Sequence, residues 1–392
     1  MGLGYIGLPT AAVAASKGID IVGVDINPDV VDIINQGKIH IIEPALDKVV
    51  KKVVESGQLR ASLKPEQADA FFIVVPTPFK QNHRADISYV ESATRMVIPY
   101  LCEGNLFVIE STSPVMTTEK MAELIFKERP DLIDKIYIAY CPERVLPGNV
   151  LYELEHNDRV IGGINSKSSE KAIEFYSQFV KGNLHKTNAR TAEMCKLTEN
   201  SSRDSQIAFA NELSMICDKA GINVWDLIEL ANKHPRVNIL QPGCGVGGHC
   251  IAVDPWFIVS DFPEQAHIIK RARETNDYKS DWCANRVIET CHEFTSKTDR
   301  EPIVACMGLA FKPDIDDLRE SPALNITKRL VNEGLDVLAV EPNIKSYTGL
   351  NLLNYQDAVK EADIVVFLVA HKEFKGLKVA NKLDFCGVVD NK

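Results

Sequence analysis

The sequence predicts an α/β protein with two parallel-sheet domains, joined by a helical central domain that contains a long connecting helix. Three observations support this prediction. Apolar strand-like runs alternate with helical stretches near both ends of the chain, the middle has a nearly continuous helical pattern, and a glycine-rich turn opens the chain. We place the domains at residues 1–190, 191–295 and 296–392 and expect both outer domains to be Rossmann-like.

The first domain contains four short runs rich in Val, Ile and Phe: IDIVGVDI, DAFFIVVPTP, LFVIESTSP and IYIAYCPE. Continuous apolar strands separated by helices predict a parallel sheet that is covered on both faces. Ligands of such sheets bind at the carboxyl ends of the strands. We therefore expect one crevice to be lined by the polar residues that follow these runs, which are Asp25, Thr77, Thr112 and Glu143.

The stretch GLGYIG matches the pattern GxGxxG through Gly2, Gly4 and Gly7, and Asp25 ends the next apolar run. Such glycines let a pyrophosphate approach a helix N-terminus, while the carboxylate accepts hydrogen bonds from the ribose. Asp rather than Arg at this place favours NAD over NADP. A purely structural glycine turn is the alternative.

Only Met1 precedes this glycine turn, so the first strand of the domain is apparently missing. That strand would be central in the sheet, and we expect an apolar slot and unpaired backbone groups on its neighbours. A natural start further upstream explains the pattern better than a damaged cofactor domain.

The central stretch TAEMCKLTENSSRDSQIAFANELSMICDKAG predicts one long amphipathic helix that Gly221 ends. The third domain resumes the alternation with PIVACMGLAFKP, a helix around SPALNITKRLVNEG, and the strands LDVLAVEPN and ADIVVFLVA. The segments KGIDIVGVDINP and EGLDVLAVEPNI both place an acidic residue at the end of a strand. The third domain therefore repeats the plan of the first.

The composition narrows the class of protein. Lys and Arg total 44 against 54 for Asp and Glu, without a basic stripe, which disfavours nucleic-acid binding. No apolar run approaches the roughly 20 residues that span a bilayer, and the start does not resemble a signal peptide. The ten cysteines show no zinc-type spacing, so we expect reduced thiols, no metal and a cytoplasmic enzyme.

Several stretches together resemble one family, the UDP-glucose/GDP-mannose dehydrogenases. They are GLGYIGLPTA, VPTPFK, ESTSP, CPERVLPG, NDRVIGG, EMCKLTEN, HPRVNILQPG, GVGGHCIAVDPWF and FKPDIDDLRESPA, and they span nearly the whole chain. The resemblance implies a four-electron oxidation of a UDP-sugar alcohol to a carboxylate with NAD as cofactor. It also implies a homodimer through the long helix, whose apolar positions are Ile207, Phe209, Leu213 and Ile216.

The resemblance makes Cys250 the nucleophile. An aldehyde cannot lose a second hydride until something adds to its carbonyl, and a thiolate adds well. The surrounding glycines would let the sugar approach. A buried, incidental cysteine is the alternative for Cys250 and our interpretation of Cys244, while His249 is a weaker candidate for raising the thiolate fraction.

Lys196, Asn200 and Arg203 share one face of the predicted long helix. Such a polar stripe is usually a solvated face, but the resemblance makes Lys196 the catalytic lysine. It assigns Asn200 to a reacting oxygen or water and Arg203 to the sugar nucleotide. By the same resemblance, Asp254 orients the lysine or a water, and Glu143 is the base for hydrolysis.

Two departures from the family bear on the substrate. Pro147 stands where some relatives carry a second glutamate, and Val253 stands where glucose-specific members often have lysine. These departures weaken an assignment to UDP-glucose and fit an N-acetylated hexosamine better. A non-catalytic nucleotide-binding protein is the alternative from another class.

The resemblance also assigns binding residues. The substrate contacts are expected from Lys196, Asn200, Arg203, Arg144, Val145, His234, Arg236, Gly247, Phe311 and Lys312. Arg236 can come from the neighbouring subunit, and His234 taken alone would be a surface or capping residue. The cofactor contacts are expected from Gly2, Gly4, Tyr5, Ile6, Gly7, Asp25, Thr77, Thr112 and Arg319.

Overall fold

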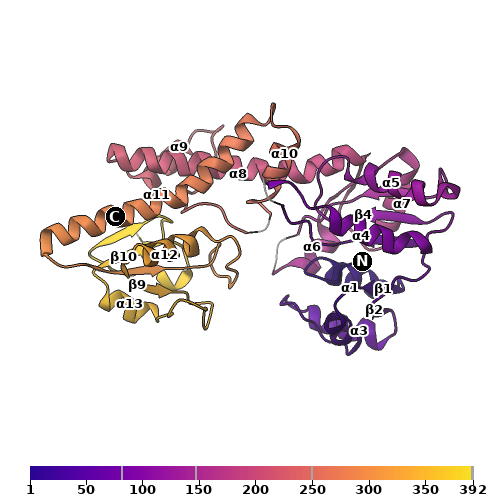
Figure 1. The fold of residues 1–392 in the computed structure, drawn as a ribbon, viewed down its shortest axis with the longest axis horizontal. Coiled ribbons are helices and arrows are strands. Elements are labelled where there is room, and N and C mark those ends of the chain that lie inside the picture. Colours follow the sequence, from indigo (N-terminus) through magenta and orange to yellow (C-terminus); the bar gives the residue numbers. More distant parts are fainter. Residues whose placement is uncertain (81–82, 146–147, 249, 390–392) are drawn as a thin grey trace. The chain divides into compact units, whose positions relative to one another are not determined.

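The computed structural model of the chain (Figure 1) describes residues 1–80, 83–145, 148–248 and 250–389. The chain divides into two compact units, Met1–Thr198 and Glu199–Lys392. The division falls inside helix α8 (Ala189–Ala220), which begins in the first unit and continues into the second. Each unit is described by itself.

The strands of the first unit form a five-stranded sheet of order β3-β4-β5-β6-β7 and a two-stranded sheet β1-β2. Only the β5–β6 pair is antiparallel among the paired strands of this unit that the structure describes. Because the two strands are antiparallel, the connection from β5 to β6 starts and ends at the same end of the strands. It therefore needs no crossover from one end of the sheet to the other. The bounds are β1 Ile21–Val24, β2 Leu59–Ser62, β3 Ala70–Ile73, β4 Leu106–Ile109, β5 Tyr137–Tyr140, β6 Arg159–Gly163 and β7 Leu184–Asn188.

Strands β1, β3, β4 and β5 lie inside the four predicted runs, so these predictions are confirmed. Strand β7 had no apolar signal, because it is an edge strand whose residues are at most half-buried.

The first residues of the chain join the two sheets. The Met1 ammonium donates to Phe72 O at 2.7 Å, Val74 N donates to Met1 O at 2.8 Å, and Gly2 N donates to Val24 O at 2.7 Å. The backbone groups of Val24, Phe72 and Val74 are therefore paired, and our expectation that they lack partners is wrong at these positions. No strand precedes α1 among the described residues.

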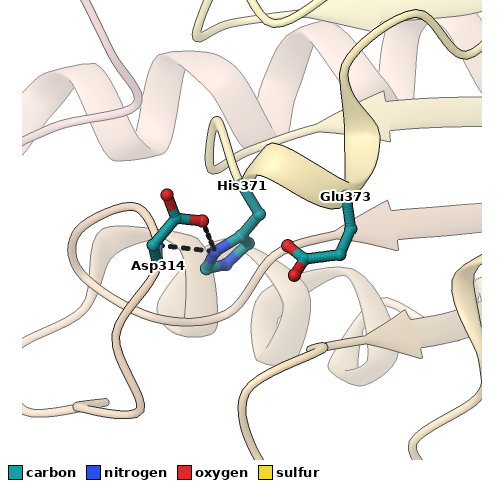
Figure 2. Close-up of side chains that lie close together, drawn as sticks. All are labelled: Asp314, His371 and Glu373. Carbon is teal, nitrogen blue, oxygen red and sulfur yellow. Dashed lines mark hydrogen bonds and ion pairs between the residues drawn. The ribbon is translucent and has the colours of Figure 1, made fainter.

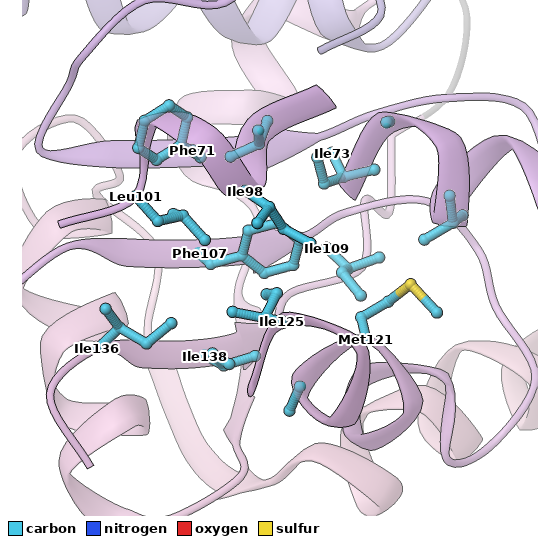
Figure 3. Close-up of a cluster of buried hydrophobic side chains, with 14 of the residues drawn as sticks. Phe71, Ile73, Ile98, Leu101, Phe107, Ile109, Met121, Ile125, Ile136 and Ile138 are labelled. Carbon is cyan, nitrogen blue, oxygen red and sulfur yellow. The ribbon is translucent and has the colours of Figure 1, made fainter. Parts of the chain in front are cut away.

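Helices cover both faces of the five-stranded sheet. Phe107, Ile109 and Ile138 point to one face, where they pack with Ile125 of α5 (Figure 3). Val90 of α4 belongs to the same cluster. Side chains alternate along a strand, so Leu106, Val108 and Ala139 lie in a second cluster on the opposite face with residues of α6 and α7. The bounds are α1 Gly7–Ser16, α2 Pro28–Asn35, α3 Leu46–Glu55, α4 Ser88–Val97, α5 Thr117–Glu128, α6 Val150–His156 and α7 Ser166–Tyr176, with short 3-10 helices η2 Ile98–Tyr100 and η3 Pro130–Leu132.

The second unit combines long helices with a four-stranded parallel sheet of order β11-β10-β8-β9. Helix α8 ends where the sequence predicts, because Gly221 follows with a left-handed φ of 68°. The remaining bounds are α9 Val224–Ala231, α10 Asp254–Asp261, α11 His267–Thr298, α12 Pro322–Asn332, α13 Tyr355–Glu361, η4 Lys372–Phe374, β8 Ile303–Met307, β9 Asp336–Val340, β10 Ile364–Phe367 and β11 Lys382–Asp384.

The predicted strands and helix of the third domain are confirmed as β8, β9, β10 and α12, and so is the α/β fold class. Within the described residues, none of the helices is sufficiently long and apolar to cross a membrane.

Candidate active site

The glycine turn in the first unit has the shape that a dinucleotide needs. Gly2 has a φ of 90°, and a Cβ there would lie 2.3 Å from Val74 O. A Cβ on Gly7 would lie 1.9 Å from Gly2 O, so these two glycines permit the tight turn. Gly4 has no atom within 4 Å of a built Cβ, which leaves its face open at the N-terminus of α1. A pyrophosphate can approach the backbone there.

The residues predicted for the rest of the cofactor follow the strand ends. Asp25 accepts hydrogen bonds from Leu3 N at 2.9 Å and from Asn27 N at 3.0 Å, which orient its carboxylate beside the glycine turn. Thr77 Oγ1 donates to Thr112 O at 2.5 Å, so the two residues predicted for the nicotinamide end are in contact. Tyr5 is exposed and Ile6 is half-buried. These residues fit NAD.

Glu143 lies in a buried polar cluster just past the carboxyl ends of strands β4 and β5. Its Oε2 forms an ion pair with Arg159 at 3.1 Å, and its Oε1 accepts from Arg144 N at 2.7 Å. The Arg144 guanidinium donates to Asp158 O at 3.2 Å. Arg144 and Val145 are half-buried, and the following Leu146 and Pro147 lie outside the described residues. Arg159 thus fixes the carboxylate predicted to act as the base.

Glu110 belongs to the same buried cluster and accepts from Tyr176 Oη at 2.5 Å. Burial raises the pKa of Glu110 from 4.5 to about 7, although the Arg159 charge opposes the shift. The folded state therefore holds this proton more tightly than the unfolded chain does. The protonated Glu110 carboxyl therefore stabilises the folded state fully at a pH below its pKa in the unfolded chain. This stabilisation is lost as the pH rises through about 7.

We therefore expect the pH dependence of stability to change in Glu110→Gln. Between about pH 6 and pH 8, the free energy of unfolding of the wild type should fall by roughly 1 kcal/mol relative to that of the variant. Urea unfolding of both proteins across this range measures the difference. Burial also lowers the pKa of the Met1 ammonium to about 6, and the Glu110 charge opposes this shift.

Glu123→Gln, at an exposed position of α5, is the control and should run parallel to the wild type. A Glu110→Gln curve that is also parallel to the wild type would show that Glu110 does not titrate in this range.

The segment that carries Cys250 leads directly into α10. Cys250 is exposed, and its carbonyl oxygen accepts from Val253 N at 3.1 Å and from Asp254 N at 2.8 Å. Asp254 is buried and accepts a hydrogen bond from Asn200 Nδ2 at 2.5 Å. Two predicted catalytic residues are thus in contact, and the turn that bears Cys250 begins beside them. Lys196 lies one turn before Asn200 on α8 and is half-buried; His249 lies outside the described residues.

Glycines let this segment lie against the loop that follows β8. A Cβ on Gly247 would lie 2.4 Å from Glu320 O and 2.7 Å from Phe311 Cβ. Gly248 N donates to Arg319 O at 3.1 Å. The structure therefore brings Gly247 and Phe311 together in the second unit, as a shared substrate site requires.

The other predicted site residues of this unit lie on the surface. Arg203, Lys312 and Arg319 are exposed, and the Arg319 guanidinium pairs with Asp317 at 2.6 Å. His234 and Arg236 follow α9 and are also exposed. His234 Nδ1 accepts from Arg236 N at 3.3 Å, a local contact outside the helix.

A buried polar ladder supports the Cys250 segment and was not predicted. Asn211 Oδ1 accepts from Gly243 N at 2.9 Å, and Asn211 Nδ2 donates to Asn276 Oδ1 at 2.8 Å. Asn276 Nδ2 then donates to Asp204 Oδ1 at 2.8 Å, where Arg273 Nη1 also donates at 2.6 Å. Asp204 and Asn211 are seven residues apart on α8, which is a helical repeat that could have indicated a shared buried face.

Removing the centre of this ladder should destabilise the second unit. Asn211→Ala leaves Gly243 N and Asn276 Oδ1 without their partner, at a cost of about 1–3 kcal/mol in the free energy of unfolding. Urea unfolding measures the change. Ser202→Ala on an exposed position of α8 is the matched control, and equal stability of the two variants would contradict a role for the ladder.

Taken together, the glycine turn, the open Gly4 face and the exposed Cys250, whose backbone contacts the Asp254 of an Asn–Asp pair, define an NAD-linked dehydrogenase with two Rossmann-like sheets. Models of three domains of one family match the chain. They are the NAD binding domain at residues 1–180, the central domain at residues 190–278 and the UDP binding domain at residues 305–391 of the UDP-glucose/GDP-mannose dehydrogenase family.

Individual relatives agree with this match. A Campylobacter jejuni UDP-N-acetyl-D-mannosamine dehydrogenase is 55% identical over 98% of this chain and 98% of its own. A Ralstonia nicotianae NDP-N-acetyl-D-galactosaminuronic acid dehydrogenase is 55% identical over 96% of this chain and 91% of its own. The structure of a Pyrococcus horikoshii UDP-D-ManNAc dehydrogenase superimposes with a TM-score of 0.89 at 38% identity, over 100% of this chain and 95% of its own. The chain therefore belongs to the UDP-glucose/GDP-mannose dehydrogenase family.

Proposed function

We propose that this enzyme oxidises UDP-N-acetyl-D-mannosamine to UDP-N-acetyl-D-mannosaminuronate in a four-electron reaction that serves surface polysaccharide synthesis. The observation that carries the proposal is the exposed Cys250 at the start of the turn into α10, next to the Asn200–Asp254 pair. Two relatives at about the same identity act on N-acetylated hexosamine derivatives, which supports this substrate class. Val253 in place of a lysine supports it independently of those names.

The two oxidation steps require different help from the protein. When bound, NAD accepts one hydride from the sugar's primary carbon at each step. In the first step Lys196 stabilises the developing oxyanion and takes part in moving the hydroxyl proton, while Asn200 holds the reacting oxygen. The Asn200–Asp254 hydrogen bond of 2.5 Å supports this role, because it fixes the orientation of the amide.

In the second step the Cys250 thiolate adds to the aldehyde and forms a thiohemiacetal. Loss of the remaining hydride gives a thioester, which water hydrolyses to the carboxylate and the free thiol. Glu143 accepts a proton from that water. Its ion pair with Arg159 at 3.1 Å holds the carboxylate in place.

The assignment of substrate is tested by a panel of nucleotide sugars. The enzyme is incubated with NAD and, separately, with UDP-N-acetylmannosamine, UDP-N-acetylglucosamine, UDP-N-acetylgalactosamine, UDP-glucose or GDP-mannose. We expect UDP-N-acetylmannosamine to be used with the highest kcat/KM and to give two NADH per sugar. Preference for another sugar would overturn the substrate, and one NADH per sugar would overturn the cysteine-dependent second step.

A non-catalytic nucleotide-binding protein is the alternative from another class. It predicts NAD binding by calorimetry without NADH formation on any of these sugars. An absence of NAD binding at millimolar concentration would overturn both functions.

We further propose a cytoplasmic homodimer with α8 at its interface. Phe209 and Ile216 are each 54% exposed, and Ile207 and Leu213 beside them are half-buried, which leaves apolar surface on this helix. Light scattering on the wild type and on Phe209→Asp tests the interface. A wild type that is monomeric at micromolar concentration would overturn it.

A further inference from the structure

Glu341, at the end of β9, holds the start of the loop that follows β8. Its carboxylate is buried, and its Oε2 accepts from Leu309 N at 2.8 Å and from Ala310 N at 2.9 Å. Its Oε1 accepts from Asn343 N at 3.0 Å. The carboxylate thus accepts hydrogen bonds from three backbone N–H groups of its own unit.

The first unit places Asp25 at the equivalent point of its own sheet, where it accepts from Leu3 N at 2.9 Å. Asp25 is only half-buried, whereas Glu341 is 4% exposed. The same acidic position therefore remains accessible to a ligand in the first unit and serves to hold a loop in the second.

His371 lies against the same carboxylate and is fully buried (Figure 2). Its Nε2 is 3.0 Å from Glu341 Oε2, and its Nδ1 accepts from Asp314 N at 2.9 Å. A backbone N–H only donates, so Nδ1 carries no proton and Nε2–H donates to Glu341. The tautomer of the neutral ring is fixed by these two partners.

This arrangement argues against a metal ion at the same place. Asp314, His371 and Glu373 offer ligand atoms that lie within 4.8 Å of one another. A metal would need a free lone pair on the imidazole, but Nδ1 already accepts a hydrogen bond and Nε2 donates one. The His371 ring is therefore engaged in hydrogen bonds to Asp314 and Glu341.

We propose that the His371–Glu341 pair holds the segment 309–314 at both ends and thereby positions Phe311 and Lys312 for the nucleotide of the sugar substrate. Glu341 fixes Leu309 and Ala310, and His371 fixes Asp314, whose backbone is left-handed with a φ of 60°. Asp314 Oδ1 in turn accepts from Lys372 N at 3.0 Å, next to His371. Phe311 and Lys312 lie between the two fixed ends.

His371 is therefore a positioning residue, and it acts through the loop. This inference rests on the proposed function, because it takes Phe311 and Lys312 as substrate contacts. A loop that is free at one end samples more conformations, and binding must then supply the free energy that orders it.

The test compares three variants. His371→Phe keeps the ring volume but removes both hydrogen bonds, and His371→Asn keeps an acceptor near Asp314 N while losing the donor to Glu341. Thr327→Val is the matched control, since its buried hydroxyl donates to Ala323 O at 2.9 Å within α12. Each variant is assayed for KM of UDP-N-acetylmannosamine, KM of NAD and kcat.

We expect His371→Phe to raise the KM of the sugar nucleotide roughly 10-fold or more while the KM of NAD stays at the wild-type value. His371→Asn should raise the same KM by less, and Thr327→Val should change neither. Hydrogen exchange of a peptide covering residues 308–318 should speed up in the two His371 variants.

A wild type that oxidises no nucleotide sugar would overturn the proposed function, whatever the variants do. With an active wild type, equal KM values for the sugar nucleotide in wild type and His371→Phe would overturn the positioning role. A parallel rise in the KM of NAD would overturn it too, since that marks general damage. If His371→Phe does not fold, His371→Asn decides, and a wild-type KM together with wild-type exchange in that variant would overturn the inference.

Discussion

Replacing Cys250 by serine is expected to block formation of the uronate almost completely while sugar-nucleotide binding persists. A serine hydroxyl is far less acidic than a thiol, so it adds poorly to an aldehyde without a dedicated base. We expect the rate of acid formation to fall by at least about 10³-fold, by comparison with the loss of other covalent nucleophiles. Mass spectrometry of the product and the number of NADH formed per sugar measure the effect.

The structure offers two cysteines for comparison with Cys250. Cys102 is also exposed, and Cys102→Ser is the matched control that should keep wild-type activity. Cys244 is buried, its Sγ lies 3.2 Å from Leu368 O, and burial raises the pKa of its thiol to about 12. Such a thiol is inert at neutral pH, in agreement with our interpretation of Cys244 as incidental. Acid formation by Cys250→Ser at a near-normal rate would show that Cys250 is not the nucleophile.

The sequence predicted well those strands and helices that have a local sequence pattern, such as an apolar run or a glycine at a helix end. Strand β4 is buried on both faces, which produces the continuous apolar run LFVI, and α8 stops where Gly221 provides a left-handed residue. Edge strand β7 has no such run, because solvent tolerates the polar residues of LHKTN. Sequence reasoning therefore finds a strand with a continuous apolar run, such as β4, more readily than a polar strand such as β7.

Some contacts of the candidate site could also be predicted from the sequence, and others could not. The Thr77–Thr112 contact follows from the rule that parallel strands end at one edge, so the sequence could place these residues together. The His371–Glu341 pair joins residues 30 positions apart, and the Arg273–Asp204 pair joins residues 69 apart. No periodicity links such positions, so these contacts become visible only once the helices and strands are packed.

Lys196 lies close to a point where buried hydrogen bonds connect α8 to the N-terminus of α5. Glu193, one turn earlier, accepts from Thr118 N at 2.7 Å and from Met116 N at 2.6 Å at the N-terminus of α5. Burial raises the pKa of Glu193, although these hydrogen bonds oppose the shift. The first turns of α8 therefore cannot rotate without breaking buried hydrogen bonds, and the Lys196 ammonium is presented from a fixed backbone.

Lys196→Ala is accordingly expected to slow turnover far more than it weakens binding. Loss of a positioned oxyanion stabiliser and proton carrier typically reduces turnover by about 10²–10⁴-fold, because the charge it stabilises exists only near the transition state. Calorimetry with UDP-N-acetylmannosamine should give nearly the wild-type affinity, whereas kcat falls. Lys219→Ala, which removes an exposed ammonium from the last turn of the same helix, should leave both quantities unchanged. An unchanged kcat in Lys196→Ala would remove this lysine from the mechanism. A loss confined to binding affinity would show that Lys196 only contacts the bound substrate, because only an interaction that strengthens in the transition state accelerates the reaction.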